Sequence, residues 1–134
     1  MLVDDERFML SALRRLLRVF PCRYRDASYE IQLVTFNTPQ AALDHAREEA
    51  FDLVITDYRM PDMNGIEFLT ALRQIQPAMK RILLTSAIEP AVTETPPVNA
   101  GIDRFLAKPC DEVTLLSTIA ELLYEQSDDS RKSP

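Results

Sequence analysis

The 134-residue sequence is poor in the residues that build disulfide frameworks and zinc sites. Its two cysteines, Cys22 and Cys110, lie far apart and form no CxxC pair, so neither a disulfide scaffold nor a thiolate metal site is indicated. His45 is the only histidine, which excludes a histidine-rich zinc site and a histidine-based catalytic triad unless a carboxylate replaces an expected ligand. Reduced thiols are typical of a reducing compartment.

Positive charge and long apolar runs are also scarce. Fifteen Lys and Arg against 21 Asp and Glu leave a formal net charge of -6, which repels a phosphate backbone. No run approaches the roughly 18 apolar residues of a membrane helix, and Asp4 and Asp5 stand where a signal peptide has basic residues. We therefore expect a cytoplasmic protein with no membrane span and no direct contact with nucleic acid.

Short apolar strands alternate with amphipathic helices along the chain. Such alternation across short connections indicates βαβ units, and hence an all-parallel sheet with helices on both faces. A polar stretch is expected from Cys22 to Ser28. We expect one domain over residues 1–126 and a polar, solvated tail over 127–134. The predicted strands are 2–3, 31–36, 51–56, 81–85 and 104–107, and the predicted helices are 9–20, 39–50, 66–75 and 113–123.

Polar side chains follow the predicted strands at the edge where parallel strands end together. Asp4 and Asp5 follow the first strand, Asp57 the third, Thr85 the fourth and Lys108 the fifth. Ligands of open α/β sheets bind at this edge. Three carboxylates gathered there repel one another unless a cation shares the site, and an all-oxygen ligand set selects Mg²⁺ or Mn²⁺ over zinc.

Lys108 and Thr85 add a cation and a hydroxyl donor to the carboxylates. Together with a metal ion they could hold the oxygens of a phosphoryl group. Transfer of a phosphoryl group to a carboxylate requires an in-line nucleophile and neutralisation of the equatorial oxygens, with little else from the protein. The residues therefore point to phosphoryl transfer onto an aspartate.

Four motifs occur in order along the chain: Leu2-Val3-Asp4-Asp5-Glu6, Leu53-Val54-Ile55-Thr56-Asp57-Tyr58-Arg59-Met60-Pro61 with Gly65, Leu83-Leu84-Thr85-Ser86 and Phe105-Leu106-Ala107-Lys108-Pro109. Together they resemble the receiver domain of bacterial two-component response regulators, and the resemblance spans nearly the whole chain. It implies a flavodoxin-like, doubly wound, five-stranded parallel sheet in the order 2-1-3-4-5 with helices on both faces. It also implies a phosphorylated signalling switch that is not an enzyme.

The resemblance also implies roles for the acidic residues. Asp57 would be the phosphoacceptor. Asp5 and Asp57 would bind Mg²⁺ directly, together with the backbone carbonyl of Arg59. Asp4 would act on the metal mainly through water.

Further roles follow from the same resemblance. Thr85 and Lys108 would hold the phosphoryl oxygens, and Thr85 and Phe105 would move together as a switch on phosphorylation. The phosphoryl donor would be a sensor histidine kinase or a histidine phosphotransfer protein, and the downstream protein partner is unknown. The donor would dock near the first helix, where arginines at 14, 15, 18, 23 and 25 are either a docking surface or a solvated helix face.

Two parts of the chain depart from the family pattern. Only Met1, Leu2 and Val3 precede the acidic pair, so we expect a short first strand. The residues after Lys108 suffice for one helix and a tail, which predicts a stand-alone receiver unless the sequence is a fragment of a longer protein.

The segment 89–99 should form a short or broken fourth helix, because Pro96 and Pro97 lack donors and each ring clashes with the preceding turn. Dimerisation through the fourth helix, fifth strand and fifth helix is therefore disfavoured.

Three alternative functions can be compared with the same residues. A haloacid dehalogenase-like phosphohydrolase needs a second Asp two positions after the nucleophile, where this chain has Arg59. A flavodoxin-like cofactor carrier needs a phosphate loop where Asp4 and Asp5 stand. A receiver-fold interaction module without phosphotransfer is disfavoured by the complete acidic, hydroxyl and lysine set.

Overall fold

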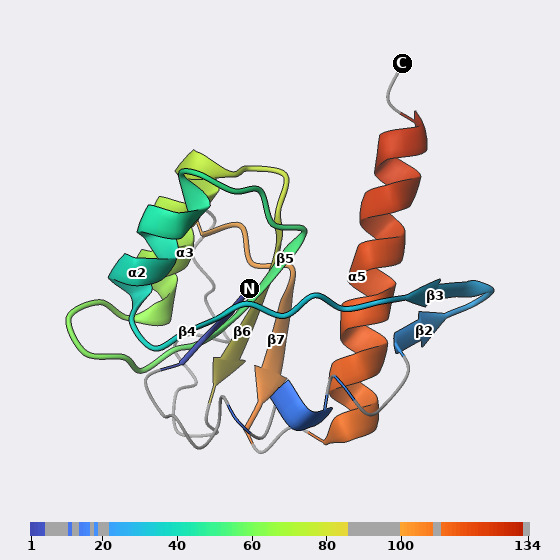
Figure 1. Cartoon of the computed structure of the whole chain (residues 1–134), viewed down its shortest axis with the longest axis horizontal. Coiled ribbons are helices and arrows are strands. Elements are labelled where there is room, and N and C mark those ends of the chain that lie inside the picture. Colours follow the sequence, from blue (N-terminus) through green and yellow to red (C-terminus); the bar gives the residue numbers. More distant parts are fainter. Residues whose placement is uncertain are drawn as a thin grey trace.

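Five parallel strands form the central sheet, in the order β4-β1-β5-β6-β7 (Figure 1). The computed structural model describes residues 1–4, 11, 14–16, 18, 22–85, 100–108 and 111–132. Counted along the chain within this sheet, the order is 2-1-3-4-5, which confirms the expected topology. The strands are β1 (Leu2–Val3), β4 (Thr35–Phe36), β5 (Leu53–Asp57), β6 (Lys80–Thr85) and β7 (Arg104–Ala107).

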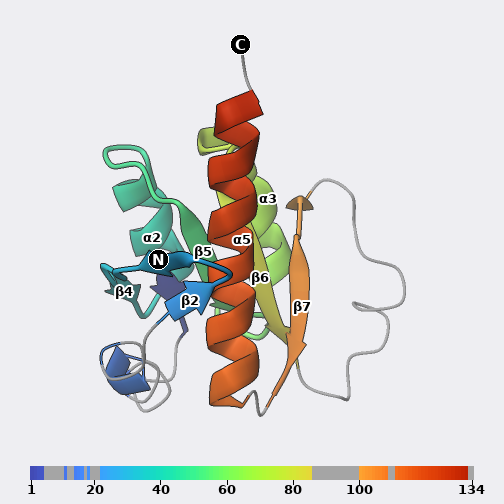
Figure 2. The same ribbon diagram turned by 90° about the vertical axis from the view of Figure 1, so that its right-hand side faces the viewer.

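Helices cover both faces of the sheet. α2 (Pro39–Ala46) and α3 (Gly65–Ile75) lie on one face, and α5 (Glu112–Lys132) lies on the other (Figures 1 and 2). Successive side chains of a strand point to opposite faces, so Val54 packs in the core under α2 and α3 whereas Ile55 packs under α5. The helical residues at 11, 14–16 and 18 agree with the helix expected over 9–20.

Side-chain caps explain where the helices begin. The Thr38 hydroxyl accepts a hydrogen bond from the Ala41 amide at 3.2 Å, with Pro39 opening α2. Asn64 and Glu67 form a reciprocal capping box at the start of α3. The capping box fixes the start of α3 at the end of the loop that follows Asp57.

Asp111 caps α5 in the same way. Its carboxylate accepts hydrogen bonds from the amide of Thr114 at 2.7 Å and from the Thr114 hydroxyl at 2.8 Å. The hydrogen bond from the Thr114 amide favours the ionised carboxylate, so it lowers the pKa of Asp111 below its ordinary value. The cap is therefore retained at neutral pH and weakens in acid, as the pH falls through that lowered pKa.

The stretch between the first helix and the sheet differs from the prediction. Instead of a polar segment, β2 (Cys22–Tyr24) and β3 (Ala27–Tyr29) form an antiparallel hairpin, and only Thr35 and Phe36 of the expected 31–36 strand join the sheet. The turn contains Arg25 with a φ of 56°. Such turns usually carry glycine or asparagine, so the sequence lacked the usual hairpin signal.

The hairpin packs against α5 (Figure 2). The rings of Tyr24 and Tyr124 meet edge to face with centroids 5.2 Å apart. The Arg25 guanidinium lies 5.5 Å from each ring centroid. Cys22 is buried, with its Sγ 3.7 Å from the Leu116 carbonyl oxygen. The hairpin therefore fastens the chain before β4 to the last helix.

Truncation of Tyr124 should loosen this hairpin. Tyr124→Ala removes an aromatic pair and a cation–π contact, so we expect a loss of about 1–2 kcal/mol in the free energy of unfolding. Amide exchange in β2 and β3 should become faster, which hydrogen-exchange mass spectrometry can measure. Tyr124→Phe keeps the ring and is the matched control. Unchanged amide exchange of β2 and β3 in Tyr124→Ala would show that Tyr124 does not stabilise the hairpin.

The last helix extends further than expected. α5 continues to Lys132, so most of the region predicted as a tail after residue 126 is helical. Arg104 on β7 makes ion pairs with Glu121 at 3.0 Å and Glu125 at 3.2 Å on α5. These groups are more than one-third exposed, so the pairs orient α5 more than they stabilise it. The domain boundary at residue 126 stays a prediction.

Candidate functional site

The parallel sheet brings the predicted site residues to one edge. Asp57 ends β5 and Thr85 ends β6, while Asp4 and Lys108 directly follow β1 and β7. Cross-strand bonds hold this edge in register, because the Tyr58 amide donates to the Leu84 carbonyl and the Lys108 amide donates to the Thr85 carbonyl at 2.7 Å. The convergence expected for these four residues is therefore present.

Lys108 lies between two buried carboxylates. Its Nζ is 2.9 Å from Oδ2 of Asp57 and 3.7 Å from Oδ2 of Asp4. The side chain of Asp4 is 1% exposed, that of Asp57 10% and that of Lys108 20%. One positive charge thus faces two negative charges in a largely buried site, and the remaining negative charge favours a further cation.

Thr85 and Phe105 occupy neighbouring strands beside this ion pair. Thr85 is buried at the end of β6. Phe105 pairs with Leu83 in register and packs partly buried against the core under α2 and α3. Their coupled movement on phosphorylation stays a prediction.

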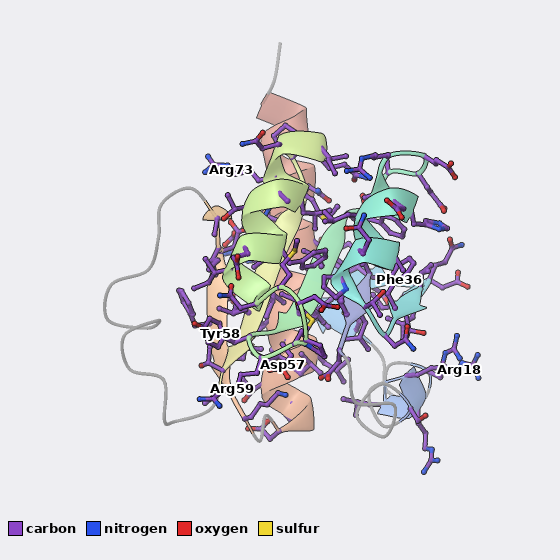
Figure 3. All side chains as sticks on the ribbon, turned by 90° about the vertical axis from the view of Figure 1, so that its left-hand side faces the viewer. Arg18, Phe36, Asp57, Tyr58, Arg59 and Arg73 are labelled. Carbon is purple, nitrogen blue, oxygen red and sulfur yellow. The ribbon has the colours of Figure 1, made fainter. Side chains whose placement is uncertain are left out.

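The remaining predicted metal ligands are Asp5 and the backbone carbonyl of Arg59. Figure 3 shows Tyr58 and Arg59 beside Asp57 at this edge, and the Arg59 side chain is exposed. Asp5 lies outside the described residues. Across residues 1–4, 22–85 and the other described ranges, no group of three potential His, Cys, Asp or Glu ligands occurs. The two described carboxylates are hard oxygen donors, which suit Mg²⁺ when waters and a carbonyl complete the shell.

Close packing of α3 fixes the backbone at Asp57. A Cβ atom on Gly65 would collide with the carbonyl oxygen of Asp57 and would lie 2.7 Å from Cδ1 of Leu83. The Gly65 amide donates to the Tyr58 carbonyl at 2.7 Å. The absence of a side chain at position 65 therefore lets the start of α3 pack directly against the end of β5.

Gly65→Ala should be destabilising for this reason. We expect the free energy of unfolding to fall by about 2 kcal/mol, since the methyl group must displace backbone in a packed region. Denaturation by urea measures the loss. A variant as stable as the original protein would contradict the packing argument.

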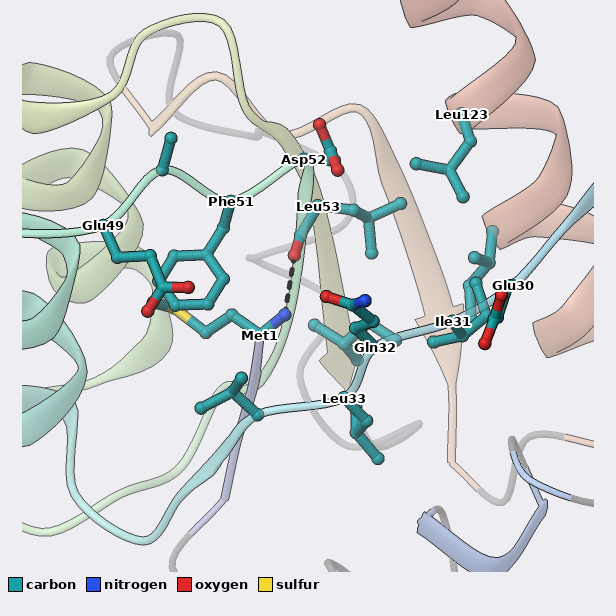
Figure 4. Close-up of a pocket in the computed structure, with 14 residues that line it drawn as sticks. Met1, Glu30, Ile31, Gln32, Leu33, Glu49, Phe51, Asp52, Leu53 and Leu123 are labelled. Carbon is teal, nitrogen blue, oxygen red and sulfur yellow. Dashed lines mark hydrogen bonds between the residues drawn. The ribbon is translucent and has the colours of Figure 1, made fainter.

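A pocket of about 230 Å³ lies away from these residues, at the amino-terminal edge of the sheet (Figure 4). It is bounded by the segment 30–34, the start of β5 and α5. The Met1 amino group beside it donates to the Leu53 carbonyl at 2.9 Å, and burial lowers the pKa of that amine to about 6. The pocket is not part of the predicted site, because Asp4, Asp57, Thr85 and Lys108 are not among the residues that line it.

An open, doubly wound parallel sheet with strand order 2-1-3-4-5 defines the flavodoxin-like class of α/β proteins, and this chain has that order. The chain matches the response regulator receiver domain family over residues 1–120. It belongs to that family. A receiver domain is a signalling module and not an enzyme, and it implies a cognate histidine kinase.

Curated relatives carry this domain within longer proteins. Transcriptional regulatory protein ZraR of Escherichia coli K12 is 32% identical over 125 residues, covering 92% of this chain and 26% of ZraR. Sensory/regulatory protein RpfC of Xanthomonas campestris pv. campestris is 32% identical over 126 residues, covering 91% of this chain and 16% of RpfC. The chain thus spans about a quarter or less of these relatives.

Solved structures agree with the fold. The signal receiver domain of an HD domain-containing protein from Pseudomonas fluorescens Pf-5 is 27% identical with a TM-score of 0.83, covering 98% of this chain and 90% of that chain. A CheY-like receiver domain protein from Methanospirillum hungatei JF-1 is 30% identical with a TM-score of 0.76, covering 96% and 94%. No helix among the described residues is long and apolar enough to cross a membrane.

Proposed function

We propose that Asp57 accepts a phosphoryl group from a phosphohistidine of a sensor kinase or phosphotransfer protein, and that the product changes binding to a downstream protein. The contact that carries this proposal is the 2.9 Å approach of Lys108 Nζ to Oδ2 of Asp57 at the carboxyl edge of the sheet. A lysine in that position attracts the negative charge of the carboxylate, and it can equally attract the negative charge of a phosphoryl group attached there.

The transfer needs only a well-placed nucleophile and neutralised oxygens. A carboxylate oxygen of Asp57 forms the new O–P bond as the P–N bond of the donor breaks, and the bonding electron pair stays on the imidazole nitrogen. Lys108 then binds a phosphoryl oxygen. Thr85, buried at the adjacent strand end, donates its hydroxyl to another and moves with Phe105 as the switch.

A divalent cation of the kind the family typically binds would complete this site. Asp57 and Asp5 would hold Mg²⁺, or Mn²⁺, together with the Arg59 carbonyl, and buried Asp4 would act on it through water. The ion would supply neutralisation of the phosphoryl oxygens. The hard oxygen donors of Asp4 and Asp57 at one lysine support this ligand set.

Incubation with acetyl phosphate tests the proposal. Intact mass spectrometry should show the gain of one phosphoryl group in the presence of millimolar Mg²⁺ and none in EDTA. If the protein stays unmodified with donor and Mg²⁺, the chain is better described as a receiver-fold interaction module without phosphotransfer.

The first helix offers a docking surface for the phosphoryl donor. Arg14, Arg15 and Arg18 are helical and exposed, and Figure 3 shows Arg18 at the periphery. An acidic donor surface would complement them. Replacing all three with glutamate should slow phosphorylation by a kinase and leave acetyl phosphate labelling unchanged; equal rates with the kinase would exclude docking there.

The proposals on the fourth helix concern residues 89–99, which lie outside the described residues. The expectation that dimerisation does not use the fourth helix, fifth strand and fifth helix therefore stays a prediction. Sedimentation of phosphorylated protein tests it, because a phosphorylation-dependent dimer built on that face would contradict it.

A further inference from the structure

The residue before the phosphoacceptor has a buried hydroxyl group whose contacts lie in the phosphoacceptor loop, residues 57–65. Thr56 is 0% exposed. Its Oγ1 donates to the backbone carbonyl of Asp57 at 3.1 Å and lies 3.8 Å from Sδ of Met60. A buried hydroxyl needs a partner, so these contacts determine where the Thr56 side chain points.

The start of α3 also packs against the same Asp57 carbonyl. Gly65 sits so close that a side chain would collide with that oxygen, and its amide closes the loop onto the Tyr58 carbonyl at 2.7 Å. Within the loop, Asp62 adopts a φ of 71° and the Met63 amide donates to the Pro61 carbonyl at 2.7 Å. The loop is therefore tight and is held at both ends.

Loss of the Thr56 hydroxyl would free only one of these ends. Valine has the shape of threonine without the donor, so the Asp57 carbonyl would lose a partner while the core stays filled. The peptide after Asp57 would then keep the bond from the Tyr58 amide to the Leu84 carbonyl but would lose the side-chain restraint on its own carbonyl, and Arg59 lies two residues beyond Asp57 in the same loop. Serine would keep the donor.

We propose that Thr56 is a positioning residue that orients the Asp57 peptide and the phosphoacceptor loop for Mg²⁺ binding. The proposal rests on the proposed function, because it concerns the ion that the transfer uses. Thr56 does not reach the phosphoryl group itself, since its hydroxyl is directed at the Asp57 backbone carbonyl and at Met60. Its effect is transmitted through the backbone of this loop.

The test compares Thr56→Val with Thr56→Ser and with Thr70→Val. Thr70 is the matched control, because its hydroxyl also donates to a backbone carbonyl, that of Ile66 at 2.7 Å, but within α3. Calorimetric titration should show that Thr56→Val raises the Kd for Mg²⁺ about tenfold, the lower end of the effect of removing a group that orients a metal ligand. Thr56→Ser should restore the affinity, and Thr70→Val should leave it unchanged.

Two further measurements separate positioning from general destabilisation. Hydrogen exchange of the metal-free protein should be faster in residues 58–64 of Thr56→Val and unchanged there in Thr70→Val. The acetyl phosphate reaction of Thr56→Val should need more Mg²⁺ but approach the original rate when Mg²⁺ saturates. If Thr56→Val does not fold, Thr56→Ala is measured in the same way.

Unchanged Mg²⁺ affinity in the folded Thr56 variant would overturn the proposal, as would an equal loss in Thr70→Val. These outcomes are distinct from failure of the proposed function. If the original protein binds Mg²⁺ but takes no phosphoryl group, phosphoryl acceptance is wrong while the affinity comparison still decides the role of Thr56. If the original protein does not bind Mg²⁺, both are wrong.

Discussion

Asp57→Asn should abolish the gain of a phosphoryl group from acetyl phosphate while leaving the fold intact. The amide has nearly the shape of the carboxylate, but its neutral oxygen is a poor nucleophile and cannot give a stable mixed anhydride. Asp57 is the described carboxylate nearest to Lys108 Nζ, and no other described aspartate ends a strand of the sheet. Labelling should therefore fall to background in intact mass spectra.

The control for this result is a surface carboxylate. Asp44→Asn changes the same chemical group in an exposed ion pair with Arg47 and should keep full labelling. Circular dichroism of both variants should match that of the original protein. Persistent labelling of Asp57→Asn would move the acceptor to another residue.

Lys108→Ala should produce the largest loss of stability that one substitution at the site causes. It leaves the carboxylates of Asp4 and Asp57 buried beside each other without the lysine cation. Removing one partner of a buried ion pair costs about 3 kcal/mol or more. We expect Mg²⁺ to restore part of this loss, because the ion replaces the missing positive charge and binds the folded state.

Urea denaturation with and without millimolar Mg²⁺ measures the effect. Arg47→Ala removes an exposed ion pair with Asp44 and serves as the control, with a change within about 0.5 kcal/mol and no dependence on Mg²⁺. If Lys108→Ala is as stable as the original protein in EDTA, the lysine does not compensate the carboxylates.

Local signals explain the parts of the fold that could be predicted. Residues 104–107 form β7 as expected, and the apolar run before Asp57 forms β5. Thr38, Asn64 and Asp111 all begin helices, because their side chains satisfy amide groups that the first turn leaves without partners. These features depend on neighbours within a few residues.

The hairpin and the length of α5 could not be predicted in this way. Residues 22–29 alternate too weakly and lack a glycine turn, and their pairing is stabilised by Tyr124, about one hundred positions away in the chain. Residues 127–132 have no apolar stripe, yet they continue the helix that begins at Asp111. Contacts distant in sequence decide the hairpin.

For the site, the amino-acid sequence by itself determined which chemical groups are present and that they follow parallel strands, so that Asp4, Asp57, Thr85 and Lys108 had to share one edge. Only the tertiary structure decided which atoms meet: Lys108 contacts Asp57 at hydrogen-bond distance and Asp4 less closely. The contacts of Thr56 were also decided by the tertiary structure, because its sequence position indicates only a buried strand residue and not which atoms its hydroxyl meets. Strand order and periodicity determine where along each strand a site residue lies. Side-chain packing determines the distances between the charged atoms, and the strength of their interaction in a buried site depends on those distances.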